Sequence, residues 1–189
     1  MKRIALASSC ALLSALACTP KEETKVQPAA SVSAVVPSEP PKKAGVDVGD
    51  PAPEVDMPLQ DGRSLKLSSL QGKNVVVYFY PKDETPGCTV EAQNFRDKAE
   101  DLKKADITVI GVSTQDAASH KAFIEKEKLP FDLAIDADQS IAKAFGVPVR
   151  NNFHARWTFL VGKDGKIKKV WRDVSPKDHA TEVLTAAGA

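Results

Sequence analysis

The residue best suited to chemistry in this 189-residue sequence is Cys88, one of three cysteines at positions 10, 18 and 88. It follows an apolar run and a short loop, and it stands at the start of a segment with helical periodicity. The first turn of a helix has unpaired backbone N–H groups and a partial positive charge, which stabilise a thiolate. The position therefore predicts a nucleophilic sulfur. The small polar residues around it indicate an open position rather than one in the core. The alternative is a cysteine that only packs in the core.

Two segments on either side of Cys88 predict how it is positioned. Residues Asn74–Tyr80 (NVVVYFY) are mostly β-branched or aromatic, which indicates a central strand buried on both faces. Pro81 ends that strand, and residues 82–87 form a loop. Residues Thr89–Lys104 then carry apolar side chains at helical spacing, which predicts a helix beginning beside Cys88.

The rest of the chain after residue 44 alternates predicted strands with predicted helices. In chain order these are a hairpin at Asp61-Gly62 between Val55–Leu59 and Ser64–Leu67, a buried strand at Ile107–Ser113, a helix at Ala117–Lys128, a strand at Asp132–Ile135, a helix at Gln139–Phe145 ending at Gly146, a hairpin of Trp157–Val161 and Lys166–Trp171, and a helix at Pro176–Ala187. This order predicts an α/β fold in which helices flank a mixed central sheet.

The amino terminus has the features of an export signal. Lys2 and Arg3 precede an uncharged stretch at 4–17, which is shorter than the about 20 residues that span a bilayer. The string L-S-A-L-A-C that ends at Cys18 resembles a bacterial lipobox, in which the cysteine is lipidated and becomes the first residue of the mature protein. We therefore expect a lipoprotein signal peptide at 1–17, removed together with Cys10. The alternative is an ordinary cleaved signal with Cys18 incidental.

The segment between this signal and the predicted fold has too few apolar residues to form a core. Residues 19–44 contain five prolines and no Leu, Ile, Met, Gly or aromatic residue. We expect residues 18–44 to be a lipidated cysteine and a disordered tether, and residues 45–189 to be a single domain. The expected location is the bacterial cell envelope, on the periplasmic side or at the outer membrane, with membrane contact only through the lipid.

Composition argues against several functions. Lys and Arg number 26 and Asp and Glu 25, so a formal net charge of +1 gives no case for nucleic-acid binding. His120, His154 and His179 show no metal-ligand spacing, and we expect them on the surface. The sequence has no glycine-rich phosphate loop, and we expect neither a metal nor an organic cofactor.

The segment around Cys88 resembles the active-site motif of a known family. Residues 80–92 read YPKDETPGCTVEA and are followed by Phe95-Arg96-Asp97. They are similar to the active-site segment of peroxiredoxins, above all the Q-type or bacterioferritin comigratory protein subfamily. Pro81, Thr85 and Cys88 match its P-x-x-x-T-x-x-C pattern, and 156–161 (RWTFLV) resembles the strand that supplies its arginine. The likeness runs from about Val48 to Leu184 and implies a thioredoxin-like fold.

The resemblance also implies a role for each matching residue. Cys88 attacks a peroxide oxygen as thiolate and becomes a sulfenic acid. Thr85 orients the peroxide, and Arg156 stabilises the thiolate and donates hydrogen bonds to the peroxide, with Arg150 as the alternative arginine. Pro81 shields the thiolate from water. Glu91 orients Arg156, unless it is only a solvated helix carboxylate.

The sequence departs from the family pattern where a second cysteine is often found. Many relatives place a resolving cysteine five residues after the first, where this chain has Gln93, and others place it on the following helix, where this chain has none. A one-cysteine peroxidase is therefore expected, monomeric or weakly dimeric, reducing hydrogen peroxide and organic hydroperoxides. An external thiol, from a thioredoxin-like protein or a small molecule, would reduce it again.

Three other functions have weaker support. A peroxide sensor that passes oxidation to a partner would use the same chemistry at Cys88. A membrane-tethered copper chaperone would need more soft ligands than one cysteine. A dithiol reductase would need a cysteine at position 91, where this chain has glutamate.

Overall fold

The structure is a computed structural model that describes residues 45–188. The expected signal peptide at 1–17 and the lipidated Cys18 with its tether at 18–44 lie outside these residues. Within 45–188, no helix combines the length and the apolar character needed to cross a bilayer.

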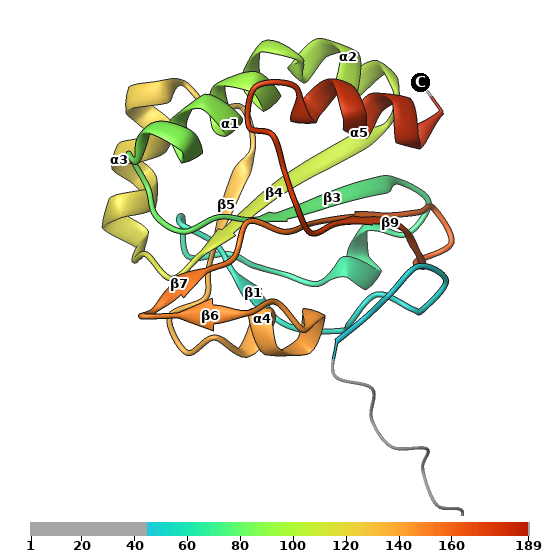
Figure 1. Ribbon diagram of the computed structural model, residues 1–189, viewed down its shortest axis with the longest axis horizontal. Helices are drawn as coiled ribbons and strands as arrows, with labels where there is room; N and C mark the ends of the chain where they lie inside the picture. The colour runs from blue at the N-terminus through green and yellow to red at the C-terminus, as the bar shows by residue number, and fades with distance from the viewer. Residues whose placement is uncertain (1–44, 189) are drawn as a thin grey trace, which may run out of the picture. The chain divides into compact units, whose positions relative to one another are not determined.

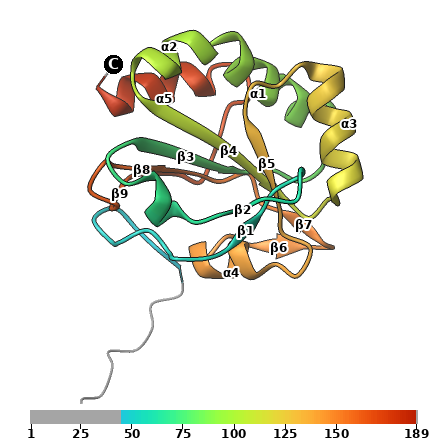
Figure 2. The same cartoon turned by 180° about the vertical axis from the view of Figure 1, so that it is seen from behind.

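A five-stranded mixed sheet forms the centre of the described domain (Figures 1 and 2). Its strands, in spatial order, are β5 (Asp132–Ile135), β4 (Ile107–Ser113), β3 (Asn74–Phe79), β8 (Thr158–Val161) and β9 (Ile167–Trp171). The central β3 pairs in parallel with β4 and antiparallel with β8, and all six of its residues are buried. The predicted two-sided central strand and the mixed sheet are therefore confirmed.

Helices cover both faces of this sheet. Figure 1 shows α1 (Pro86–Asp97), α2 (Ala99–Lys104) and α5 (His179–Ala187) on one side and α4 (Ser140–Phe145) on the other. The helix α3 (Ala117–Glu127) follows β4 and packs against α1. Alternate residues of β3 face the two layers: Tyr78 belongs to the core beneath α1 and α5, and Phe79 to the core that contains α4.

The helix predicted at Thr89–Lys104 is two helices, and it begins earlier than predicted. Thr85 is the extended cap residue, with φ −74° and ψ 147°, and Pro86 is the first helical residue. The fixed φ of proline suits this position, where its missing N–H has no helical partner. A break at Lys98, with φ −99° and ψ 9°, separates α1 from α2. The last helix also starts at His179 rather than at Pro176.

Short hairpins complete the domain. The predicted turn at Asp61-Gly62 joins β1 (Met57–Pro58) to β2 (Ser64–Leu65), which a short 3-10 helix η1 (Leu67–Leu70) follows. A hairpin of β6 (Val149–Arg150) and β7 (Phe153–His154) was not predicted. Its turn residues Asn151 and Asn152 are both left-handed, with φ 50° and 63°, as a tight hairpin turn requires. This hairpin leads directly to Arg156.

The three histidines are not on the surface, so that expectation was wrong. His120 and His179 are 0% exposed and His154 is 2% exposed. Each is buried beside a polar partner on another segment: His120 beside Asp83, His154 beside Asp136, and His179 beside Thr158. A histidine with such a partner is stable in a core, and the partners are 18 to 37 residues away in sequence.

Candidate active site

Cys88 lies in the first turn of α1, as expected. The Thr89 N–H donates to the Thr85 carbonyl at 2.9 Å, so the amides of Gly87 and Cys88 precede the first helical hydrogen bond. These amides and the helix dipole surround the sulfur with partial positive charge. Cys88 is a free thiol and is 1% exposed. The expected open position is therefore wrong: Cys88 is buried, with the Arg156 guanidinium beside its sulfur.

Arg156 brings a positive charge to this sulfur from the segment between β7 and β8. Its Nη2 donates to Cys88 Sγ at 3.3 Å, across 68 residues of sequence. Its Nη1 donates to Glu91 Oε2 on the next turn of α1. The side chain keeps 20% exposure, while that of Glu91 has none. Arg150 is exposed on β6, so Arg156 is the arginine that reaches the cysteine.

Glu91 is a buried carboxylate that holds Arg156, and the alternative of a solvated helix carboxylate is wrong. Burial raises the pKa of Glu91 from 4.5 to about 7, although the charge and hydrogen bond of Arg156 oppose the rise. Its other oxygen, Oε1, is buried without a hydrogen-bond partner among the described residues. Glu91, Arg156 and Cys88 thus form one electrostatically coupled group in which two acidic groups share a single cation.

Thr85 lies on the loop beside Cys88. Its Oγ1 donates to the Lys82 carbonyl at 3.0 Å, which leaves the oxygen lone pairs available to accept a hydrogen bond from a bound molecule. Pro81 is half-buried where the strand passes into the loop. The structure thus brings Cys88, Glu91 and Arg156 together, while the peroxide-orienting role of Thr85 and the shielding role of Pro81 stay predictions.

Two further residues shape the site, and neither was predicted from the sequence. A Cβ atom at Gly87 would lie 3.3 Å from Arg156 Nη2, so glycine gives the guanidinium room beside the helix start. Tyr78 stacks on Phe95 with ring centroids 5.0 Å apart, and its buried hydroxyl has no hydrogen-bond partner among the described residues. Burial first, and then the negative charges of Glu91 and Cys88, raise the pKa of Tyr78 well above its usual value. No spacing in the sequence could have shown either contact.

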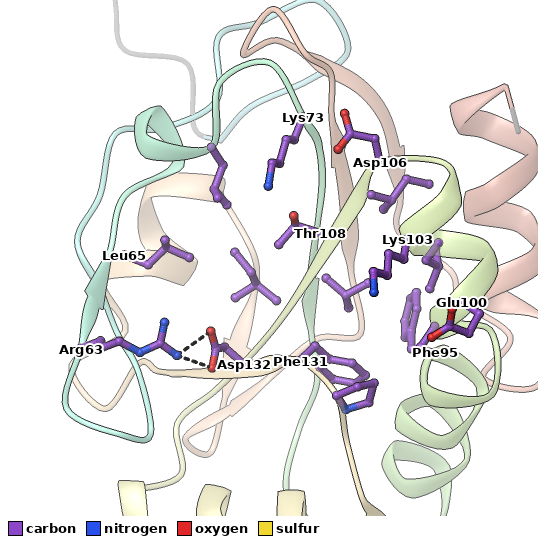
Figure 3. A pocket seen from close by; sticks show the side chains of 17 residues that line it. Arg63, Leu65, Lys73, Phe95, Glu100, Lys103, Asp106, Thr108, Phe131 and Asp132 are labelled. Carbon is purple, nitrogen blue, oxygen red and sulfur yellow. Dashed lines mark hydrogen bonds and ion pairs between the residues drawn. The ribbon is translucent and has the colours of Figure 1, made fainter.

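A groove of the described domain lies away from these residues (Figure 3). It has a volume of about 590 Å³ and lies between α2, the first half of β4 and the residues before β5, with the Arg63–Asp132 ion pair at one end. Its lining includes Phe95 of α1 but not Cys88, Thr85, Glu91 or Arg156. The groove is therefore not the place where Cys88 would react.

Comparison with known proteins agrees with this geometry. The AhpC/TSA family model matches residues 48–170. The chain is 42% identical to peroxiredoxin Bcp of Bacillus subtilis over 146 residues, which cover 74% of this chain and 93% of that protein. The chain belongs to the peroxiredoxin family. Within this family of thioredoxin-dependent peroxidases it is of the Bcp or Q type.

Two further relatives support the peroxiredoxin assignment and the fold. The chain is 44% identical over 142 residues to the chloroplastic peroxiredoxin Q of Oryza sativa subsp. japonica, covering 74% of this chain and 65% of that protein. The structure of Xanthomonas campestris peroxiredoxin Q superposes with a TM-score of 0.70 at 32% identity, covering 77% of this chain and 96% of the other. The expected thioredoxin-like fold is therefore confirmed for this peroxiredoxin.

Proposed function

We propose that the chain is a one-cysteine peroxiredoxin that reduces hydrogen peroxide and organic hydroperoxides at Cys88. The observation that carries this proposal is the hydrogen bond from Arg156 Nη2 to Cys88 Sγ at 3.3 Å, at the start of α1. A thiolate there has a cation and helix amides beside it, and the same groups can stabilise the charge that develops on a peroxide during attack.

The proposed reaction begins with attack of the Cys88 thiolate on the nearer peroxide oxygen. The sulfur–oxygen bond forms, the O–O bond breaks, and the departing oxygen takes a proton and leaves as water or an alcohol. Arg156 stays beside the reacting atoms throughout, because Glu91 holds its other guanidinium nitrogen. The Thr85 oxygen accepts a hydrogen bond from the peroxide and orients it for in-line displacement.

The sulfenic acid at Cys88 then needs a thiol from another molecule. Cys88 is the only cysteine among residues 45–188. Position 93, where many relatives have a second cysteine, is occupied by Gln93, whose Nε2 donates to Glu127 Oε2 on α3 at 2.7 Å. One external thiol forms a mixed disulfide with Cys88 and releases water, and a second thiol releases the disulfide and restores the reduced enzyme. A thioredoxin-like protein or a small thiol can supply both.

This proposal is tested by following peroxide consumption by the purified protein with dithiothreitol as the only reductant. We expect many turnovers per Cys88, together with a sulfenic acid at Cys88 that a dimedone-type reagent traps and mass spectrometry locates. A single oxidation without turnover would contradict the peroxidase and would favour a sensor that passes its oxidation to a specific partner.

We also propose that the protein is a lipoprotein attached to the bacterial cell envelope through Cys18. The short uncharged stretch at 4–17 and the lipobox-like string ending at Cys18 support this proposal. In a bacterial host, Cys18→Ser is expected to move the protein from the membrane fraction to the soluble fraction and to remove the lipid mass. Cys10→Ser is the matched control and should leave the membrane fraction unchanged. Equal fractionation of both variants would contradict the anchor.

A further inference from the structure

The central sheet is incomplete beside the first residues of β4. The strand β4 pairs with β3 from Ile107 onward, but β5 pairs with β4 only from Ile110, which lies opposite Asp132. Residues 107–109 therefore have a strand on one side and, among the described residues, no strand on the other. We call residues 107–109 the open edge of β4. Such an edge is a template on which another extended chain can form main-chain hydrogen bonds.

Two residues of the open edge direct their backbone groups away from β3. The carbonyls of Asp106 and Val112 accept hydrogen bonds from the β3 side, whereas the carbonyl of Ser113 accepts from the β5 side. Because neighbouring residues of a strand direct these groups to opposite sides, Ile107 and Val109 direct theirs to the side where β5 is missing. No turn or loop of the described residues fills this place by bonding to the backbone of either residue.

The open edge of β4 is the floor of the groove shown in Figure 3, which has a volume of about 590 Å³. Phe95 and Leu102 line one wall and belong to the core beneath α1 and α5. Leu65 and Leu70 line the other wall and pack against the second core. A strand in this groove would therefore lie between two layers, and its alternate side chains would contact one wall or the other.

The charged residues of the groove do not balance one another. They are three cations and three carboxylates: Arg63, Lys73, Lys103, Glu100, Asp106 and Asp132. Arg63 pairs with Asp132 at 2.8 Å, and Asp106 pairs at 3.0 Å with Lys163, which is outside the lining. No ion pair joins the other three to any described residue, which leaves two cations against one carboxylate.

The two unpaired cations are placed to receive a ligand in the groove. Lys73 precedes β3 and Lys103 belongs to α2, and both side chains are exposed. Figure 3 shows their ammonium groups pointing into the groove from opposite sides. An acidic side chain of a bound segment would gain a charge-assisted hydrogen bond from either lysine.

We propose that this groove binds an extended, acidic segment of another protein, which adds to the open edge of β4 as a short strand. The backbone edge selects an extended peptide, because a ligand without a main chain would leave the groups of Ile107 and Val109 unused. Such a contact leaves the peroxidase site accessible. Ile107 pairs with Asn74, the first residue of β3, whereas Cys88 follows the last residue of that strand.

The test is a titration of the full-length, ¹⁵N-labelled protein with the blocked peptide Thr-Glu-Val-Val-Glu-Thr. In an extended peptide its two glutamates face opposite walls, as Lys73 and Lys103 do. We expect saturable shifts of the amide resonances of 107–110 and of α2, with a Kd of about 100 μM, as suits an interface far below standard size. Binding requires no peroxidase activity, so the result does not depend on the proposed function.

The matched pair of variants is Lys103→Ala and Lys104→Ala. Lys103→Ala should raise the Kd about 10-fold, because it removes a hydrogen bond to a charged group. Lys104 is the next residue of α2, pairs with Asp101 and does not line the groove, so Lys104→Ala should bind like the wild-type protein. An equal Kd for the two variants would overturn the role of the charge.

Two further probes separate the backbone from the side chains. The same peptide with every main-chain amide N-methylated keeps its glutamates but has no main-chain donor, and it should cause no shifts at 107–110. Laurate carries a carboxylate and an apolar chain without any main chain, and it should also fail to saturate these resonances. Binding of the N-methylated peptide with the Kd of the parent peptide, or binding of laurate in its place, would overturn strand addition.

Discussion

A protein with Cys88→Ser is expected to consume peroxide no faster than buffer with dithiothreitol, a loss of at least about 10³-fold. Serine is nearly the same size as cysteine, so the closed pocket around a residue with 1% exposure stays filled. Its hydroxyl ionises far less readily than a thiol and cannot form a sulfenic acid. Steady-state peroxide consumption measures the loss, and near-ultraviolet circular dichroism checks that the fold is intact.

The control for this experiment removes a different cysteine. Cys18→Ser also replaces one cysteine by serine but leaves Cys88 beside Arg156 and Glu91, so it should turn over peroxide like the wild-type protein. Peroxide consumption by Cys88→Ser at the wild-type rate would show that the reacting thiol is elsewhere in the chain, and the proposed function would fail.

Replacement of Arg156 by methionine is expected to lower the rate constant for peroxide oxidation by about 10²–10³-fold, the usual effect of removing one preorganised donor. Methionine keeps much of the side-chain volume but neither donates to Cys88 Sγ nor pairs with Glu91. The same change should cost about 3 kcal/mol of folding stability at pH 8, because it leaves a buried carboxylate without its partner. Stopped-flow oxidation and urea unfolding measure the two effects.

The stability loss of Arg156→Met should also depend on pH. In the wild-type protein the pKa of Glu91 is about 7, mainly because of burial, against 4.5 for an ordinary glutamate. Glu91 thus binds a proton more tightly in the folded state than in the unfolded state. Its contribution to the free energy of unfolding therefore falls as the pH rises from about 4.5 to about 7, and is constant above that. Without Arg156 the pKa of Glu91 rises above 7, so the variant continues to lose stability where the wild-type protein does not.

A double variant separates this charge effect from the loss of packing. In Glu91→Gln/Arg156→Met the amide does not titrate, so the deficit that grows above pH 7 should disappear while the loss of peroxide reactivity remains. A stability deficit for Arg156→Met that is the same at pH 5 and pH 9 would contradict the electrostatic coupling of Glu91 with Arg156.

Local sequence was sufficient to predict the elements that position Cys88. The β-branched and aromatic run at Asn74–Tyr80 permits few structures other than a two-sided strand, and the strand found there is central. The turn at Asp61-Gly62 and the helix end at Gly146, where φ is 76°, follow from the backbone conformations that glycine allows. These features depend on neighbours within a few residues, and a single sequence records such neighbours directly.

The motif around Cys88 likewise predicted that residue as the nucleophile and identified the family. It also marked Thr85, Glu91 and Arg156 as residues to examine, although only through resemblance. Periodicity could not locate the start of α1 at Pro86, because the first turn of this helix is made by a proline, a glycine and a cysteine rather than by an apolar repeat.

Contacts between segments that are distant in the chain could not be predicted from the sequence alone. The approach of Arg156 to Cys88 spans 68 residues, and that of His120 to Asp83 spans 37. The burial of all three histidines, the room that Gly87 makes for Arg156 and the covered position of the sulfur arise from the same long-range packing. A polar side chain is predicted to lie on the surface as long as its partner is unknown. The reason is that burying a polar side chain is costly in free energy only when it has no hydrogen-bond partner. The sequence thus singled out Cys88 as the predicted nucleophile, and tertiary packing buried it and placed Arg156 and Glu91 beside it.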